Sequence, residues 1–230
     1  MFPVYLKEPG FSEPDDPIYY LVAKEGLFQV KQTPLFRAQR RVEGLGWLES
    51  AEEGIQLKLP LIPASLLADA LGFFKQVFRK YRAEAVLLLY WRGATGQYET
   101  RIPRQQVTGS HCRYEIGPTP AGCLRVGTIH SHGVADAFHS EVDDQDEEHD
   151  DGLHVTIGTL HAKPTVACSL VVDRRRYTLR PELLLEVMPW ELTPTIRMED
   201  LDDSLVAPPQ RGPGDGPGPV TYQRGLVIEE

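Results

Sequence analysis

The chain has 230 residues, of which 41% are hydrophobic and 25% charged, and its formal net charge is −9 at pH 7. This length and composition predict one domain with an appendage or two small domains, and they exclude a globally disordered chain. The negative charge argues against a nucleic-acid groove, and no stretch approaches eighteen apolar residues, so neither nucleic acid nor a membrane is an expected partner.

The cysteines and the first residues favour a cytoplasmic location. The chain has three cysteines, Cys112, Cys123 and Cys168, and none belongs to a CxxC pair. We therefore expect no disulfide framework and a reducing compartment. The opening segment, MFPVYLKEPGFSEPDD, lacks the basic region followed by an apolar region that marks a secretory signal.

Residues 1–53 are rich in short strand patterns. The segment IYYLVAKEGLFQVKQ has two β-rich runs around Gly26 and predicts a hairpin. The segments PLFRAQRRV and LGWLES continue in the same style. No catalytic pattern occurs here, so we expect a β-rich N-terminal subdomain that serves packing or docking.

Residues 54–181 mix strand and helix patterns. GIQLKLPLIP predicts a strand that ends at proline, and residues 64–82 predict an amphipathic helix with a broad apolar face. A strand buried on both faces is expected in EAVLLLYW, and a short helix with Ser140 as its N-cap in SEVDDQDEEHDD. Further strands are expected in GQYETRIP, QQVTGSHCRYEI, LRVGTIH, LHVTIGTL, TVACSLVVD and RYTL. This order predicts an α/β (α+β) fold in which helices flank a mixed sheet.

Residues 182–230 form a C-terminal extension of different character. The segment RPELLLEVMPWELTP is expected to pack on the body of the domain. APPQRGPGDGPGP is too rich in proline and glycine for a regular element and predicts a flexible tail. The last segment, VTYQRGLVIEE, has the composition of an extended peptide that pairs with a sheet edge.

Two histidines stand one residue apart at the end of an apolar run. Because side chains alternate along a strand, His130 and His132 point to the same side. Their imidazoles would supply half of a tetrahedral zinc site. An isolated His-x-His is more often a pair of ordinary surface histidines, so the interpretation needs a further ligand.

A serine and an aspartate follow at a spacing that supplies one. If Ser140 caps a helix, Asp143 lies on its first turn and can face the strand end. Its carboxylate would be a third ligand and leave the fourth position open, as in catalytic zinc sites. A capping box explains Ser140 and Asp143 without a metal, but it does not explain the histidines.

The whole pattern resembles the JAMM motif of the JAB/MPN (MPN+) zinc metalloprotease family. The motif is His130-Ser131-His132, seven residues, then Ser140-x-x-Asp143, and the order of elements from about residue 54 to 180 is also similar to that family. The resemblance implies a cytidine-deaminase-like JAB/MPN domain over residues 54–181 that binds one zinc ion per chain. With its β-rich N-terminus, the chain further resembles the JAB-type proteins of bacterial PRTRC cassettes, which also encode E1-like and E2-like proteins.

The resemblance also assigns catalytic roles. The family uses an upstream glutamate at the start of the strand after the first long helix, and Glu84 stands there. That glutamate would act as base and then acid, and Ser140 would donate a hydrogen bond to the oxyanion. From the residues alone, Glu99 and Glu115 are equal candidates for the base. Ser131 is expected to orient the loop and not to act as a nucleophile.

Some positions depart from the family or lie beside its motif. Many members have proline after the second histidine, where Gly133 stands here. The block from Asp143 to Asp151 has seven acids in nine residues, which indicates either a solvated helix face or a role in selecting partners. We expect His139 at the surface and not as a fourth ligand. The other histidines, His111, His149, His154 and His161, have no motif partners and are expected to be structural or exposed.

The expected function is that of a zinc metallopeptidase, an isopeptidase or deubiquitinase-like hydrolase. The resemblance implies a substrate with an extended C-terminal tail, carried by a ubiquitin-like or sulfur-carrier protein and bound beside a sheet edge. ThiF-type E1-like and E2-like proteins are the expected partners. Two alternatives stay open: a catalytically silent scaffold that binds such partners, and a zinc hydrolase acting on a small amide.

Overall fold

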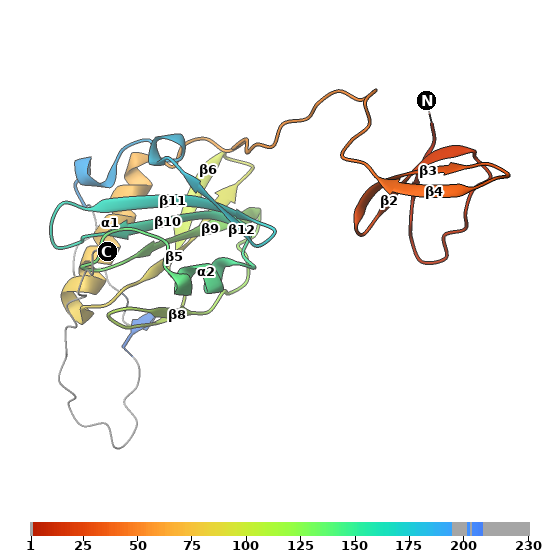
Figure 1. Cartoon of the computed structure of the whole chain (residues 1–230). Helices are drawn as coiled ribbons and strands as arrows, with labels where there is room; N and C mark the ends of the chain where they lie inside the picture. The colour runs from red at the N-terminus through yellow and green to blue at the C-terminus, as the bar shows by residue number, and fades with distance from the viewer. Residues whose placement is uncertain (1, 195–201, 203, 209–230) are drawn as a thin grey trace, which may run out of the picture. The chain divides into compact units, whose positions relative to one another are not determined.

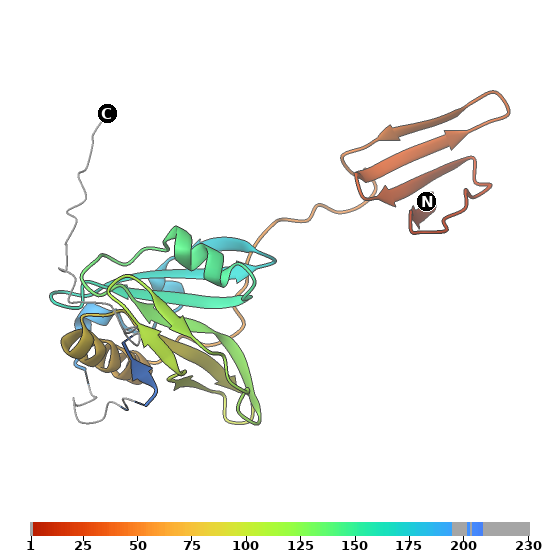
Figure 2. The ribbon, with the colours of Figure 1, turned by 90° about the horizontal axis from the view of Figure 1, so that it is seen from below.

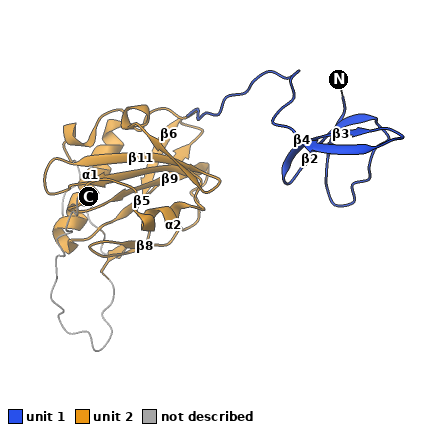
Figure 3. Cartoon of the chain, viewed as in Figure 1, with its two compact units in different colours: residues 1–57 blue, residues 58–230 orange. Residues whose placement is uncertain are grey.

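The computed structural model describes residues 2–194, 202 and 204–208. The chain divides into two compact units, residues 1–57 and 58–230 (Figure 3). The predicted Pro/Gly-rich tail and the last segment lie outside the described residues, apart from 207 and 208. Within the described part, no helix is both long and apolar enough to cross a membrane.

Unit 1 is a four-stranded sheet with a small core. Its strands lie in chain order: β1 (Val4–Leu6), β2 (Ile18–Ala23), β3 (Gly26–Gln32) and β4 (Arg37–Arg41). The predicted hairpin is confirmed, because β2 and β3 pair antiparallel with Ala23 opposite Gly26. Fully buried Tyr19, Leu21 and Val30 form the core. The segment LGWLES is not a strand, so that prediction was wrong.

Unit 2 is built around a six-stranded mixed sheet. Its order is β12-β11-β10-β9-β5-β6, in which β9 and β10 run parallel and the other neighbours antiparallel. The strand bounds are β5 (Val86–Arg92), β6 (Gln97–Arg101), β9 (Cys123–Ser131), β10 (Gly152–Gly158), β11 (Thr165–Val172) and β12 (Arg175–Leu179).

Two α-helices pack on this sheet. The helix α1 (Ala64–Tyr81) has the predicted apolar face, and eleven of its residues are buried. The short α2 (Glu141–Glu147) begins after its N-cap Ser140, as predicted. Figures 1 and 2 show the two helices on opposite faces of the sheet. Both faces of the central strands are therefore covered, which explains the continuous apolar run of β5. The described residues thus confirm the broad α+β class.

Two strand predictions in unit 2 were wrong. Residues 54–63 form no strand, and only Ile62 makes a bridge, to Leu185. Pro60 and Pro63 lack the N–H groups that a ladder needs. The segment QQVTGSHCRYEI is not one strand but the hairpin β7 (Gln105–Val107) and β8 (Cys112–Tyr114), which forms a separate sheet with β13 (Val206–Ala207).

The start of the C-terminal extension packs on the body, as expected from RPELLLEVMPWELTP. Leu184 and Leu185 are 2% exposed. The amide of Ile62 donates to the carbonyl of Leu184 at 2.7 Å, and the amide of Glu186 donates to the carbonyl of Ile62 at 3.0 Å. These bonds attach the segment to the chain just before α1.

Candidate metal centre

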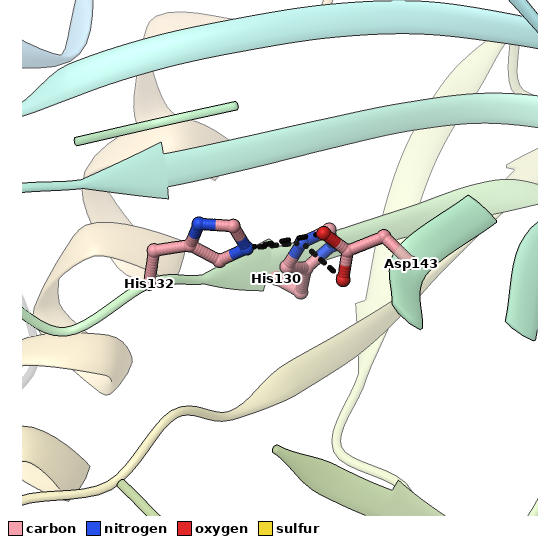
Figure 4. Close-up of side chains that lie close together, drawn as sticks. All are labelled: His130, His132 and Asp143. Atoms are coloured by element: carbon pink, nitrogen blue, oxygen red, sulfur yellow. Dashed lines mark hydrogen bonds and ion pairs between the residues drawn. The ribbon is translucent and has the colours of Figure 1, made fainter. Parts of the chain in front are cut away.

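The three predicted ligands converge from a strand end and a helix start. His130 lies near the end of β9, and His132 follows the strand directly. The amide of His132 donates to the carbonyl of Ile157 at 3.0 Å, which extends the pairing with β10 to this position. Asp143 lies in the first turn of α2. Its carboxylate points toward both imidazoles (Figure 4).

The spacing of the ligand atoms fits a tetrahedral metal. His130 Nε2 lies 3.3 Å from His132 Nε2. Asp143 Oδ2 lies 3.2 Å from His132 Nε2, and Asp143 Oδ1 lies 3.4 Å from His130 Nε2. Ligand atoms 2.0–2.1 Å from a tetrahedral zinc lie about 3.3–3.4 Å from one another. The two imidazole nitrogens have this spacing, and each carboxylate oxygen has it to one of them, so the three residues can hold one small ion.

The charge state of Asp143 suits a ligand. Burial opposes its ionisation, but hydrogen bonds with His130, His132 and Ser140 hold the pKa of the carboxyl well below its usual value. Burial alone would lower the pKa of His132, yet the hydrogen bond to Asp143 and the charges of Glu84 and Asp143 raise it. The low pKa keeps the carboxylate ionised at neutral pH, which a metal ligand requires.

Ser140 and Asp143 form the capping box that the sequence predicted as an alternative. The Ser140 amide donates to Asp143 Oδ2 at 2.7 Å, and the Asp143 amide donates to Ser140 Oγ at 3.2 Å. The Ser140 hydroxyl also donates to Asp143 Oδ2 at 2.7 Å. The capping box and the ligand position therefore coexist, since the same contacts aim the carboxylate at the histidines. The single hydroxyl proton must leave Oδ2 before it can serve another acceptor.

Glu84 is placed beside the triad by Ser131. Ser131 is fully buried, its amide donates to the carbonyl of Ala85 at 3.0 Å, and its Oγ accepts from the amide of Ala85 at 3.1 Å. These bonds continue the antiparallel register, in which Val86 pairs with His130, to Ala85 and Ser131, and Glu84 is the next residue back along the chain. Burial raises the pKa of Glu84 to about 7, and Asp143 adds to the rise while His132 opposes it. Ser131 therefore holds the backbone next to Glu84, whereas the sequence predicted that it orients the loop.

Glu84 and the triad line one cavity of about 280 Å³. The rival candidates for the base lie elsewhere. Glu99 is ion-paired with Arg92 and Arg101, and Glu115 lines a different pocket. Besides Glu84, His130, His132, Ser140 and Asp143, the cavity is bordered by residues of the β7–β8 hairpin, including Cys112 and Tyr114, and by Val134, Phe138 and Val142 from the loop and helix after β9.

The loop between His132 and Ser140 needs its glycines. Gly133 has φ +52°, a left-handed conformation that proline cannot adopt. The departure from the family pattern at this position therefore has a conformational reason. Gly158 lies beneath the same loop, where an added Cβ would come within 2.3 Å of the Ala137 nitrogen. The close approach of the loop to β10 depends on that missing side chain.

The structure corrects one prediction around the site and refines an open one. In the acidic block, Asp144, Asp146 and Asp151 are exposed as on a solvated face, whereas Glu147 and Asp150 are 4% and 9% exposed. Asp150 pairs with Arg125 at 2.5 Å. His139 is not a surface residue but half-buried, and burial lowers its pKa to about 4. Its Nε2 is buried and has no hydrogen-bond partner among the described residues. It remains outside the ligand cluster, as expected.

Sequence reasoning missed two polar side chains that approach the ring nitrogens of His130. Thr156 Oγ1, on β10, lies 3.1 Å from His130 Nε2, and Glu147 approaches the other ring nitrogen, Nδ1, at 3.6 Å. The sequence contained one signal for Glu147, its spacing from Asp143. Glu147 follows Asp143 by four residues, so a helix that presents Asp143 to the site presents Glu147 on the same face.

Comparisons with known proteins add no assignment. No model of a known protein family matches the chain, and a search of curated proteins found no match.

Proposed function

We propose that unit 2 is a zinc-dependent peptidase or isopeptidase with a JAB/MPN fold. The single observation that carries the proposal is the spacing of 3.2–3.4 Å between the ligand atoms of His130, His132 and Asp143. A carboxyl group with a pKa near 7, that of Glu84, lines the same cavity. Three ligands leave one position of a tetrahedral zinc open, which is the arrangement of catalytic sites.

The side chains would divide the work as the motif implies. When bound, zinc lowers the pKa of water from 15.7 to about 7 and polarises a carbonyl. Glu84 would accept the proton of the attacking water and pass it to the leaving amine; a pKa near neutrality suits a group that does both. The Ser140 hydroxyl would turn from Asp143 Oδ2 to the oxyanion. The Ser140 amide would keep its hydrogen bond to Asp143 Oδ2. Loss of such a donor typically costs about 2.7–4 kcal/mol of barrier.

The substrate proposed is the C-terminal tail of a ubiquitin-like or sulfur-carrier protein. The motif resemblance supplies this class, together with E1-like and E2-like partners. Two structural features are compatible with it. The strand β8 is at the edge of its sheet, and its residues Cys112 and Tyr114 border the cavity. An extended tail that pairs with such an edge would deliver its last peptide bond to Glu84.

Two alternatives lead to different results. A catalytically silent scaffold usually lacks metal ligands, whereas this chain retains all three and a candidate base, which favours the enzyme. A hydrolase of small amides would use the same cavity and need no sheet edge. Cleavage of a small acyl-amide without cleavage of a ubiquitin-like fusion would favour this second alternative.

The test separates metal binding from catalysis. Purified wild-type protein should contain about one zinc ion per chain, and Asp143→Ala should release most of it. Glu84→Gln should retain the zinc and lose cleavage of ubiquitin-like fusions, read by mass with and without a chelator. Glu99→Gln is the matched control, because it removes the same charge away from the cavity. Metal content near zero in the wild type, or full cleavage by Glu84→Gln, would refute the proposal.

A further inference from the structure

Glu147 is a buried carboxylate on the site-facing side of α2. It lies one helical turn after Asp143, and its side chain is only 5% exposed. Its Oε1 lies 3.6 Å from Nδ1 of His130. The same imidazole therefore faces Asp143 with Nε2 and Glu147 with Nδ1.

The carboxylate is fixed by contacts from three strands of the sheet. Oε1 lies 3.1 Å from Nδ1 of His154 on β10 and 3.3 Å from Oγ1 of Thr128 on β9. Oε2 accepts from Nη2 of Arg176 on β12 at 2.7 Å. Arg176 is fixed in turn, since its Nη1 donates to Ser169 Oγ at 2.5 Å. A buried carboxylate is costly unless it is paired, and these partners provide the pairing.

These partners also keep Glu147 ionised. Burial opposes the charge, but His154, His130 and Arg176 lower the pKa of the carboxyl to about 2. The carboxylate held by these partners stands 3.6 Å from His130 Nδ1. Asp144, on the outer side of the helix, also pairs with Arg176 at 2.5 Å but is exposed.

The tautomer of His130 connects this charge to the metal site. A histidine that binds a metal through Nε2 carries its proton on Nδ1, and that proton would face Glu147 Oε1. The distance of 3.6 Å is longer than a hydrogen bond, so in this structure the carboxylate acts on Nδ1 electrostatically. Ligand histidines commonly direct their other nitrogen to a carboxylate, which fixes the ring and its tautomer.

We propose that Glu147 is a positioning residue that sets the orientation and the Nδ1–H tautomer of His130, so that Nε2 is available to the metal. The inference builds on the proposed zinc site and adds a residue that the motif does not contain. The alternative is that Glu147 only joins α2 to Arg176. The two differ in outcome, because a joining role affects the stability of the fold and leaves the affinity of the folded protein for zinc unchanged.

The test compares two isosteric substitutions on adjacent positions of the chain. Glu147→Gln removes the charge beside His130. Glu148→Gln removes a charge whose partners are Arg174 and His149, away from the site. Zinc affinity would be measured by competition with a chromogenic chelator, on samples shown by circular dichroism to be folded without metal. Glu147→Gln should bind zinc about 10–100-fold more weakly than wild type, and Glu148→Gln should match wild type.

A measurement on the wild type covers the case in which Glu147→Gln does not fold. In zinc-loaded, ¹⁵N-histidine-labelled protein, long-range ¹H–¹⁵N correlation should show the His130 proton on Nδ1 and zinc on Nε2. The opposite tautomer would overturn the inference, as would equal zinc affinity of wild type and folded Glu147→Gln. Absence of zinc binding by the wild type would instead overturn the proposed function.

Discussion

The four-stranded sheet of unit 1 and the six-stranded sheet of unit 2 bury different kinds of side chain. In unit 1 the buried side chains among residues 2–57 are Tyr19, Tyr20, Leu21 and Val30, and the edge strand β4 is exposed throughout. In unit 2 both faces of the central strands are covered, and polar side chains are buried beside apolar ones. These polar residues include Thr128, Ser131, His132, Glu147, His154, Thr156 and Ser169.

The difference shows where the chain accepts an energetic cost. A buried polar group is unfavourable unless it is hydrogen-bonded, so a fold gains nothing from a cluster of them where leucine or valine would pack. In unit 2 most of these residues lie on β9, β10 and α2, around the paired histidines, and Ser169 lies on the neighbouring β11. A sheet covered on both faces keeps water from these groups and strengthens their electrostatic interactions. Unit 1, with a thin core, has no comparable environment.

The largest expected effect distinguishes the two cores. Ile129 is fully buried on β9, next to His130, and Ile129→Ala should destabilise unit 2 by about 2–5 kcal/mol. Val30→Ala in unit 1 removes two methyl groups, at about 0.8 kcal/mol each, and should leave zinc content unchanged. Denaturant unfolding followed by near-ultraviolet circular dichroism, with zinc measured in parallel, checks both. Loss of zinc from a folded Val30→Ala would contradict the separation of the two units.

A smaller effect is expected in the loop that links the candidate ligands His132 and Asp143. An L-residue in the left-handed conformation costs about 1–2 kcal/mol, so Gly133→Ala should destabilise unit 2 by that amount. Its added Cβ would make only ordinary contact with Phe78, at 3.5 Å. Gly133→Pro should destabilise unit 2 more than Gly133→Ala and should also weaken zinc binding. Proline fixes φ near −65°, which would change the direction of the backbone directly after His132. Thermal unfolding and zinc affinity measure the two effects, and a stabilised Gly133→Pro would be the contrary result.

Much of unit 2 was predictable because its signals are local. The periodicity of α1, the apolar run of β5 and the N-cap Ser140 each depend on a few neighbouring residues. The convergence of His130, His132 and Asp143 was also predictable, since alternation along a strand and the first turn of a capped helix determine the directions of their side chains. Glu84 was a different case: nothing local distinguishes it from Glu99 or Glu115, and only the motif favoured it.

The errors came from interactions between distant segments. Residues 54–63 have a strand pattern but no strand partner, and their prolines lack the N–H groups that pair in a sheet. The acidic block has the composition of a solvated face, yet Arg176 and Arg125, remote in sequence, pair with its buried members. Such charge compensation cannot be seen from the block itself, which is why Glu147 was recognised only in the structure.

The smallest expected effect concerns unit 1. Every candidate site residue lies in unit 2, so a chain of residues 58–230 should bind zinc with the affinity of the full chain and cleave a small peptide amide at the same rate. Chelator competition and a peptide assay measure this. Any change would be expected only for a whole protein substrate, through weaker binding and a higher KM at equal kcat. A shortened chain that is folded but free of zinc would mean that the metal centre depends on unit 1. The difference between the cores of the two units would then not correspond to a division of function.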